Sequence, residues 1–510
     1  MDDWIDHNPP KFGVNWACTM DVAIRVANWI LGFYFFRDSK AFTDEFLIKF
    51  LKSLLIHGRH IMANLENKGI TNNHYLADLV GLIYLGIAFP EFKEARRWRE
   101  FGVQELVKEM EKQVYDDGMD FEASTCYHRL ALELFFYPAV LCRLNGIELP
   151  QPFHEKLKKM FDFVLYVLKP NGRMPQIGDN DNGRLHVLGK RDILDMTYLL
   201  TFATLYFGDP SYKIEEFGFA SEALWLFGPE AYERWKKMRG RSVEELESKA
   251  FPKGGIYVMR HKRDYMIISC GSIGQGGPGG HAHNDKLSFE LCIDGEDIIV
   301  DPGTGVYTGN PFVRDRLRSL TSHNAPFTTY KLSEVEKFEG LFINRSNIKV
   351  KVLNWKPKGK KIQLMAERSF LGNSFPMSRH LFMFDIASRI QAVVFIYSRN
   401  IDAPLIIRLC FAPRLSLAQK PNGEIWAYAC DSQFRIRIAP IWEDARPVLA
   451  LKTGLYSHGY GNLQETPVVE YIWFPPHTRK RGILFQAIPA STYKYVPLEL
   501  SMDFPLDEGR

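Results

Sequence analysis

The stretch around which the chain is organised reads Gly279-Gly280-His281-Ala282-His283-Asn284-Asp285-Lys286-Leu287-Ser288-Phe289-Glu290, and an apolar run, Leu291-Cys292-Ile293, follows it directly. Side chains of an extended segment alternate between two faces, so His281 and His283 are expected on the same face. A polar loop over 294–297 and a second apolar run over 298–300 come next, and Asp301-Pro302-Gly303 closes that run. This pattern predicts a β-hairpin that carries two imidazoles beside an inward carboxylate.

A third histidine, His323, follows within Ser322-His323-Asn324. Imidazole nitrogens and a carboxylate oxygen form a ligand set that suits Zn²⁺. The His-x-His spacing alone is a weak signal, because one hydrogen-bonded core histidine and two surface histidines would give the same letters. The residues by themselves leave both interpretations open.

Length and composition indicate two large domains. The 510 residues exceed one ordinary core, and 46% of them are hydrophobic and 14% aromatic, enough to build cores and to line a groove with rings. The 64 basic and 60 acidic side chains give a net charge of +4, which does not indicate nucleic-acid binding. A local basic groove is still compatible with this charge. Seven scattered cysteines without a C-x-x-C pair argue against a disulfide scaffold and against a thiolate zinc site.

The N-terminal residues show neither a basic start nor an apolar core of a signal peptide. No stretch is apolar for long enough, without charge, to span a membrane, so no membrane insertion is expected. The chain as written is expected to be soluble and cytoplasmic, or periplasmic or secreted if it is a mature or trimmed form.

Residues from about 12 to 250 show helical periodicity without strand-like alternation. The apolar faces recur over 15–31, 42–65, 76–89, 92–115, 124–144, 153–168 and 192–207, with Pro and Gly at most breaks. Helical pairs joined by loops favour an α/α toroid or another helical array. The first domain is therefore predicted over residues 1–250.

Strand patterns dominate after Phe251-Pro252-Lys253-Gly254-Gly255. They recur over 256–260, 265–270, 287–293, 348–352, 362–366, 390–397, 405–411 and 482–487, with turn signals between them. The second domain, residues 251–510, is predicted to be an antiparallel β-sandwich. The expected fold class is thus a two-domain α+β protein.

Two polar segments precede apolar helices. In Thr71-Asn72-Asn73-His74-Tyr75, either Thr71 or Asn72 suits the N-cap, and the next two residues fall in the first turn, where free N–H groups and the helix dipole favour an anion. Tyr127 takes a comparable place after Asp120-Phe121-Glu122-Ala123-Ser124. The alternatives are a cap with a surface histidine, and a half-buried packing tyrosine.

Two further groups could contact a ligand. The loop over 174–184, which contains Gln176, Asp179 and Asp181, could bind a sugar, bind a cation or simply turn. Arg25 and Trp29 lie one helical turn apart, and an arginine beside an indole suits the carboxylate and the ring face of a uronate. A core tryptophan with a solvated arginine is the alternative. The substrate contacts expected from these segments are Arg25, Trp29, Arg59, Asn72, His128, Gln176 and Asp179.

Over about residues 15–330, in order, the motifs resemble those of the heparinase II/III-like polysaccharide lyases. The shared motifs are Asn72-Asn73-His74, Tyr127-His128, the His-x-His of 281–283, Asp301-Pro302-Gly303 and His323-Asn324. That family joins an α/α toroid to a β-sandwich, and its usual additional N-terminal helices leave open whether the toroid is complete here. Asn324 is followed by Ala325 rather than the common threonine, a difference expected to affect strand packing.

The resemblance implies cleavage of a uronic-acid-containing, anionic polysaccharide by β-elimination. It assigns catalysis to Asn73, His74, Tyr127 and His281, with Tyr307 as a less direct candidate. It assigns a zinc ion, structural in role, to His283, Asp301 and His323. Removal of the proton next to the uronate carboxylate needs a base, an acid for the leaving oxygen and stabilisation of the carboxylate, and phenol, imidazole and amide side chains can supply these. Whether Tyr127 or His281 is the base stays open.

Two other functions are compatible with the residues. A glycoside hydrolase on a toroid needs paired carboxylates, which Glu122, Asp179 and Asp181 could supply, although the histidines and tyrosines would then be unexplained. A non-catalytic carbohydrate-binding protein is the second alternative. The identity of the polymer, endo or exo action and the oligomeric state are not encoded in any motif found here.

Overall fold

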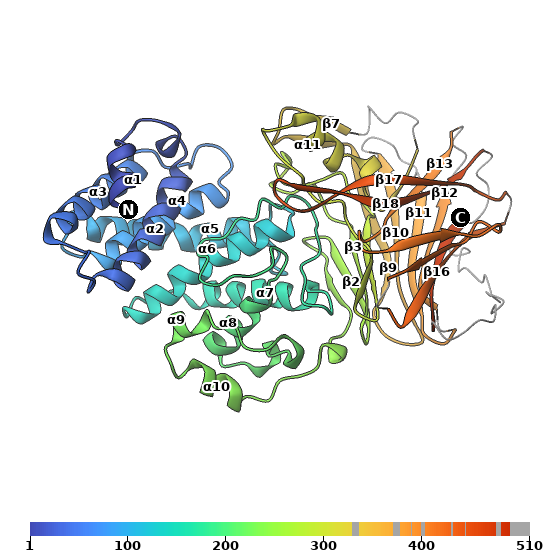
Figure 1. Ribbon diagram of the computed structural model, residues 1–510, viewed down its shortest axis with the longest axis horizontal. Coiled ribbons are helices and arrows are strands. Elements are labelled where there is room, and N and C mark those ends of the chain that lie inside the picture. The colour runs from blue at the N-terminus through green and yellow to red at the C-terminus, as the bar shows by residue number, and fades with distance from the viewer. Residues whose placement is uncertain are drawn as a thin grey trace.

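A helical part precedes a β-sheet part, as Figure 1 shows for the computed structural model. The structure describes residues 1–328, 336–370, 378–388, 390–398, 403–429, 432–443, 445–475 and 481–489, so the end of the predicted β domain, 490–510, lies outside the described residues. The expected two-domain α+β class is confirmed. The first strand begins at Lys249, close to the boundary expected at 250.

The predicted helices are all present. They are α2 (Thr19–Phe36), α3 (Asp44–Ala63), α4 (Asn73–Ala88), α5 (Ala95–Gln113), α6 (Thr125–Leu144), α7 (Gln151–Val167) and α8 (Thr197–Phe207). Three short helices, α1 (Asp2–His7), α9 (Ala223–Phe227) and α10 (Ala231–Lys237), lie outside the predicted ranges. The last long one begins later than the predicted 192 because Asp195 Oδ1 accepts a hydrogen bond from Thr197 N and ends a turn there. None of the described helices is long and apolar enough to cross a membrane.

Helix α4 forms the centre of the helical part. All of its residues from Tyr75 to Gly86 are buried, and it packs against α2, α3, α5 and α6. A helix that is apolar on every side is stable only when other elements surround it. Gly81 allows the closest approach, because a Cβ there would lie 2.9 Å from the Cβ of Ala23 on α2.

The second part consists of antiparallel sheets. A five-stranded sheet holds β1 (Lys249–Phe251), β2 (Ile256–His261), β3 (Asp264–Ser269), β4 (Phe289–Ile293) and β5 (Glu296–Ile299) in sequence order. An eight-stranded sheet has the order β14-β15-β16-β19-β12-β11-β10-β9, a four-stranded sheet the order β17-β18-β13-β6, and β7 pairs with β8. One buried apolar core includes side chains of the three larger sheets, among them Leu291, Phe382 and Val469, which is the sandwich arrangement.

The remaining strand bounds, with the one long helix of this part, are β6 (Pro326–Thr328), β7 (Glu336–Phe338), β8 (Asn344–Ser346), β9 (Ile348–Lys356), β10 (Lys361–Phe370), β11 (Ser378–Asp385), β12 (Ile390–Ser398), β13 (Leu405–Cys410), β14 (Ser416–Gln419), β15 (Ile425–Tyr428), β16 (Phe434–Trp442), β17 (Val448–Gly459), β18 (Asn462–Trp473), β19 (Arg481–Pro489) and α11 (Pro311–Arg318). Every pairing between these described strands is antiparallel.

The predicted hairpin is present as β4 and β5, but the two histidines precede it in an irregular loop. The strand begins only at Phe289, because Leu287 adopts a φ of 64°, which extended strands do not use. We expected strand alternation to place His281 and His283 on one face. That explanation is wrong, because neither histidine lies in a strand. The loop, and not a strand, aims both side chains.

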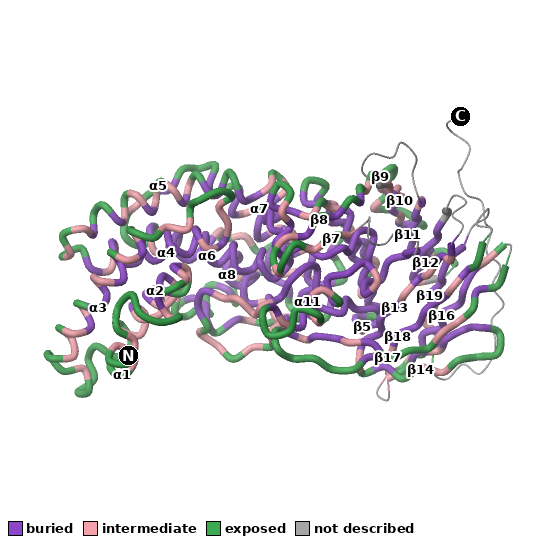
Figure 2. The backbone as a smooth tube through the Cα atoms, turned by 90° about the horizontal axis from the view of Figure 1, so that it is seen from above, coloured by how far each residue is buried: buried purple, intermediate pink, exposed green. Residues whose placement is uncertain are grey.

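The five-stranded sheet docks on α7. Phe163 and Val167 of α7 share a buried apolar cluster with Phe251, Ile256 and Ile267 of the sheet. Beside it, the buried Lys169 ammonium lies 2.5 Å from Glu290 Oε2 and 2.8 Å from Asp297 Oδ1. Figure 2 shows buried backbone continuing from the helices through β5 into the sheets, so the junction is part of the core.

We expect Lys169→Met to lower the free energy of unfolding by about 3–5 kcal/mol, because both carboxylates would stay buried without their cation. Urea denaturation followed by circular dichroism measures the change. Lys159→Met, on the exposed face of α7, is the matched control and should change the free energy by less than about 0.5 kcal/mol. Equal effects of the two substitutions would contradict the prediction.

Candidate functional site

The starts of two long helices face the β domain at the junction. Asn72 caps α4, its Oδ1 accepting a hydrogen bond from His74 N at 3.0 Å, and Ser124 caps α6, its Oγ accepting one from Tyr127 N at 3.1 Å. This confirms the predicted cap before α4, with Asn72 in that role. Both caps place polar first-turn residues opposite the loop of residues 271–288.

Asp179 lies at the centre of the junction and is fully buried. Its Oδ2 is 3.0 Å from His281 Nδ1, and its Oδ1 is 2.9 Å from His283 Nε2. The Arg314 guanidinium on α11 donates hydrogen bonds to both oxygens, with Nη2 2.7 Å from Oδ2. Burial raises the pKa of Asp179, but the charge of Arg314 and the two imidazole hydrogen bonds lower it by more, to far below its ordinary value. The carboxylate is therefore ionised and orients both histidines.

The tautomer of His281 follows from this contact. Because Asp179 is ionised, His281 Nδ1 carries the proton and donates it, in the arrangement by which an aspartate orients the base of a catalytic triad. Nε2 is then the nitrogen that can accept or return a proton, and it lies 3.5 Å from Glu122 Oε2. The His281 side chain is 9% exposed, so it is not fully enclosed.

Tyr127 stacks on His281. The two ring centroids are 3.6 Å apart with an interplanar angle of 16°. The phenol donates to Asp181 Oδ2 at 2.7 Å and lies 3.3 Å from the Tyr307 hydroxyl. Burial, then the neighbouring Tyr307 and Asp181, raise the pKa of Tyr127 well above its ordinary value, so the phenol keeps its proton at neutral pH.

Asn73 is fixed by a carboxylate rather than by solvent. Its backbone N–H and its Nδ2 both donate to Glu122 Oε1 at 2.9 Å, while Gln275 Nε2 donates to Glu122 Oε2 at 3.0 Å. Glu122 is itself completely buried. These contacts join α4, the segment before α6 and the loop of the β domain. Residues from both domains therefore form one polar cluster.

The site predicted from the sequence separates into three groups. Tyr127, His281, Tyr307 and Asn73 lie in the cluster just described. His283, Asp301 and His323 lie beside it, with one ligand atom of each within 4.8 Å of the others. His74 belongs to a third group, and its Nδ1 lies 2.5 Å from Glu66 Oε2. Burial lowers the pKa of His74, but hydrogen bonds with Cys18 and Glu66 raise it by more, to about 10.

The second group has free donor atoms. His283 Nδ1 and His323 Nε2 are buried and have no hydrogen-bond partner. Their other ring nitrogens face carboxylates, Asp179 for His283 and, at 2.7 Å, Asp301 Oδ2 for His323. His283, which directs Nε2 at Asp179 and leaves Nδ1 bare, has the arrangement of a metal ligand with its supporting carboxylate, whereas Asp301 beside His323 is itself a candidate ligand.

Three predicted substrate contacts lie outside these groups. The Arg25 guanidinium covers the Trp4 ring at 4.2 Å and donates to His57 at 3.1 Å. Trp29 belongs to the same aromatic group, 5.1 Å from Trp4. On the outer face of α3, Arg59 pairs with Glu94 at 2.6 Å.

Two other predicted contacts are enclosed. His128 is buried, its Nδ1 accepting from Asp120 N at 3.1 Å and its Nε2 3.1 Å from Met160 O; burial lowers its pKa to about 4, so it is neutral. Gln176 Nε2 donates to Ser457 O at 3.0 Å and joins the domains.

Arg314 was not identified from the sequence. Asn310 caps α11, with its Oδ1 accepting from Val313 N, and Pro311 occupies the first turn. This Asn-Pro start places Arg314 and Arg318 on one face of the helix. The pattern signals a helix, but the carboxylate that makes Arg314 part of the site is 135 residues away.

A helical domain joined to an antiparallel sandwich, with a Tyr–His stack at the junction, defines the class of protein. Residues 1–198 match the heparinase II/III N-terminus family, and residues 244–327 match the heparinase II/III-like C-terminal family. The chain belongs to the heparinase II/III-like polysaccharide lyase family.

The relatives and solved structures agree with this assignment. The chain is 27% identical over 370 residues to a heparin-sulfate lyase of Bacteroides stercoris, covering 70% of this chain and 50% of that protein. It is 26% identical over 325 residues to a heparin-sulfate lyase of Pedobacter heparinus, covering 60% and 43%. The chain thus spans about half the length of the curated relatives it matches.

Among solved structures, a crystal structure of heparinase III superposes with a TM-score of 0.74 at 19% identity, covering 96% of this chain and 72% of that one. A heparan sulfate lyase from Pedobacter heparinus gives 0.64 at 20% identity, again covering 96% and 72%. These likenesses confirm the fold.

We expect Asp179→Asn to lower the free energy of unfolding by about 3–5 kcal/mol, because Arg314 would stay buried without its carboxylate. Chemical denaturation measures the loss. Glu100→Gln removes an exposed partner of Arg96 on α5 and should cost less than about 1 kcal/mol. If Asp179→Asn lowered the free energy of unfolding by no more than this control does, the buried pair would contribute nothing to stability.

Proposed function

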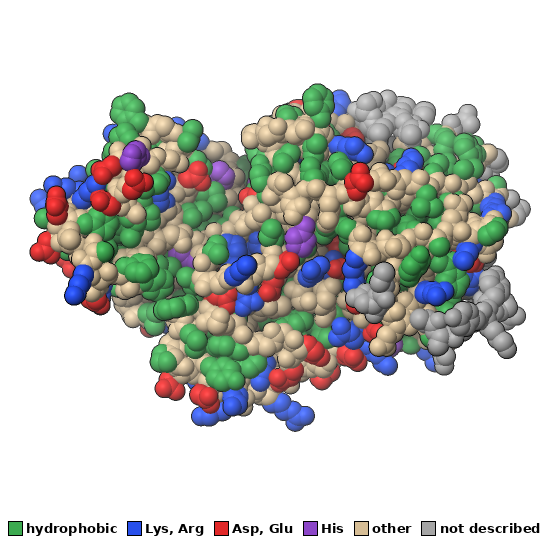
Figure 3. All heavy atoms as spheres, in the orientation of Figure 1, with side chains coloured by type: hydrophobic (Ala, Val, Ile, Leu, Met, Phe, Trp, Pro, Cys, Tyr) green, Lys and Arg blue, Asp and Glu red, His purple; other side chains and the backbone are tan. Residues whose placement is uncertain are grey.

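We propose that this protein is a polysaccharide lyase that cleaves a uronic-acid-containing glycosaminoglycan by β-elimination. The observation that carries the proposal is the stacked Tyr127–His281 pair, one ring holding its proton and the other oriented to accept one. The heparin-sulfate lyase names of the relatives make heparan sulfate the first substrate to test. Figure 3 shows the surface hollowed between the helical part and the part that carries α11 and β7, where a chain-like substrate could lie.

The proposed reaction uses both rings. His281 Nε2 accepts the proton from C5 of the uronate, because Nδ1 is committed to Asp179. The bond between C4 and the linking oxygen then breaks, and the electron pair left at C5 forms the C4=C5 double bond. Tyr127 gives its proton to the departing oxygen, since its raised pKa keeps the phenol protonated at neutral pH, where it cannot serve as the base.

The developing negative charge lies on the uronate carboxylate. Asn73 stands at the N-terminus of α4, where the helix dipole favours an anion. Its own backbone N–H and side-chain amide donate three hydrogen bonds to Glu122, which hold Asn73 in place. Arg314 adds no free charge to this site, because Asp179 neutralises it.

The hydrolase alternative fits the contacts less well. Glu122 accepts from Asn73 and Gln275, and Asp179 is paired with Arg314. A hydrolase needs one carboxyl group as an acid and another as a base or nucleophile. These two are occupied as structural acceptors, which favours elimination.

Elimination is tested by ultraviolet absorbance during incubation with heparan sulfate and other uronate polymers, because the C4=C5 double bond conjugated to the carboxylate absorbs and a hydrolysis product does not. We expect Tyr127→Phe and His281→Ala each to slow the rise by about 10²–10⁴-fold. Tyr137→Phe, on the same helix, is the matched control, since the Tyr137 hydroxyl is buried without a hydrogen-bond partner and should be dispensable.

New reducing ends without a rise in absorbance would contradict the lyase proposal and indicate a hydrolase. Polymer binding without any cleavage, unchanged in both variants, would contradict the lyase proposal and indicate a carbohydrate-binding protein.

We also propose that His283, Asp301 and His323 hold a zinc ion. The two bare, buried imidazole nitrogens and the nearby carboxylate fit the donor set of zinc. A bound zinc ion would cross-link the loop before β4 to the segments after β5 and after α11. In that role it would fix the loop that presents His281 without taking part in the reaction.

Zinc removal should therefore destabilise the β domain. We expect the zinc content to fall by one equivalent in His323→Ala and to stay unchanged in His458→Gln, whose histidine pairs with Asp192 elsewhere. Metal analysis by mass spectrometry gives the content, and the thermal midpoint should fall with the zinc. Full zinc content in His323→Ala would contradict the assignment.

A further inference from the structure

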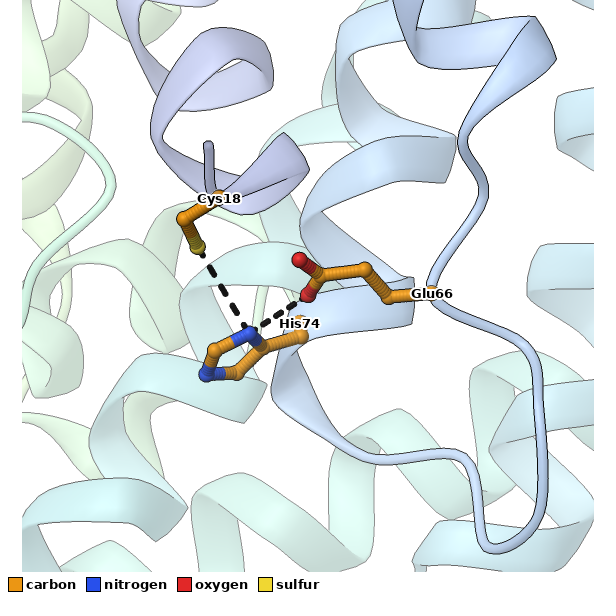
Figure 4. Close-up of side chains that lie close together, drawn as sticks. All are labelled: Cys18, Glu66 and His74. Atoms are coloured by element: carbon orange, nitrogen blue, oxygen red, sulfur yellow. Dashed lines mark hydrogen bonds and ion pairs between the residues drawn. The ribbon is translucent and has the colours of Figure 1, made fainter. Parts of the chain in front are cut away.

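A second group of possible metal ligands lies in the helical part, and Figure 4 shows it. Cys18 precedes α2, Glu66 lies in the loop between α3 and α4, and His74 is in the first turn of α4. Their ligand atoms all lie within 4.8 Å of one another. This group shares no residue with the cluster at the domain junction.

The two contacts of His74 converge on one atom. Cys18 Sγ is 3.8 Å from His74 Nδ1, and Glu66 Oε2 is 2.5 Å from the same Nδ1. A nucleophile relay uses opposite ring nitrogens, one for the thiol and the other for the carboxylate. Convergence on a single nitrogen is instead the arrangement of three ligands around one point, and Figure 4 shows the other ring nitrogen turned away from both partners.

The spacing suits a tetrahedral ion. Bonds of about 2.3 Å to sulfur and about 2.0 Å to nitrogen place these two atoms about 3.6 Å apart in a tetrahedral zinc site. The observed separation of Cys18 Sγ and His74 Nδ1 is 3.8 Å. The Glu66 carboxylate is closer, as a hydrogen-bonded partner of an imidazole is, and has only to move outward to admit an ion.

The surroundings orient the ligands and leave access. Glu66 Oε1 accepts from Thr19 N at 3.0 Å, and Glu66 N donates to Asp78 Oδ2 at 2.8 Å, which fixes the carboxylate as a supporting shell does around a metal. The side chains of His74 and Glu66 are 42% and 27% exposed, so an ion can arrive from solvent and keep a water ligand.

We propose that Cys18, Glu66 and His74 bind a divalent transition-metal ion of the zinc class. Thiolate, imidazole and carboxylate supply one ligand each, and the fourth position is open to water. The absence of C-x-x-C pairs does not conflict with this site, because it needs a single cysteine. The proposed lyase reaction uses Asn73 but assigns no step to His74, its neighbour in the chain, and the metal site can be tested without substrate.

Cobalt(II) is the probe, because a cobalt–thiolate bond gives a charge-transfer band in the near ultraviolet and a cobalt–histidine–carboxylate site gives none. We expect the full chain, reduced and titrated with cobalt(II), to develop this band. Cys18→Ser should abolish it, and Glu66→Gln should weaken binding by about tenfold or more. The other described cysteines are buried, so Cys18 is the accessible thiol among them.

His458→Gln is the matched control, since it breaks a partly exposed His–carboxylate pair without a thiol, and the band should persist. His74→Gln provides a second test that keeps all cysteines and should also remove the band. No band in the parent chain, or a band unchanged in Cys18→Ser or His74→Gln, would overturn the proposal. Because the readout uses no polysaccharide, an inactive lyase would not affect it.

Discussion

The contact on which the site depends is the one between Asp179 and Arg314. A buried carboxylate is costly unless a cation and several donors satisfy it, and here a guanidinium and two imidazoles do so. The pair joins the loop after α7 to α11, so it forms only when the helical part and the β part are docked. Orientation of His281 is consequently a property of the assembled molecule and not of either domain.

The docking itself is provided by apolar packing and a second buried ion pair. The cluster around Phe163 and the Lys169 contacts hold the five-stranded sheet against α7. Apolar area supplies the driving force, and the charged groups add a fixed register. The stacking of Tyr127, a residue of α6, on His281 of the β part requires that register, because a shift of about 1 Å would impair proton transfer.

Local patterns predicted the fold well and the site in part. Helix periodicity found α2 to α8, and the cap rule found Asn72, because both depend on residues close in sequence. The motif resemblance named Tyr127, His281 and the group of His283, Asp301 and His323, which the structure brings together. Arg314 and the contacts of Glu122 depend on long-range docking, and the glycine-rich loop depends on backbone angles, so local patterns miss them. Arg25 and Trp29 share a helix face as expected, but Trp4 and His57 use that face for packing.

One carboxylate gives two neighbouring histidines opposite tautomers. His281 directs Nδ1 at Asp179 and has Nε2 3.5 Å from Glu122 Oε2, whereas His283 directs Nε2 at Asp179 and leaves Nδ1 without a hydrogen-bond partner. The Nε2 atom of His281, on the ring that stacks against Tyr127, is the atom proposed to exchange a proton. The Nδ1 atom of His283 lies in a closed environment next to His323. Burial lowers the pKa of His283 by more than the contact with Asp179 raises it, so the lone pair is available to the proposed metal ion. The different roles proposed for His281 and His283 thus follow from which ring atom faces the shared aspartate, because the two rings present opposite edges to it.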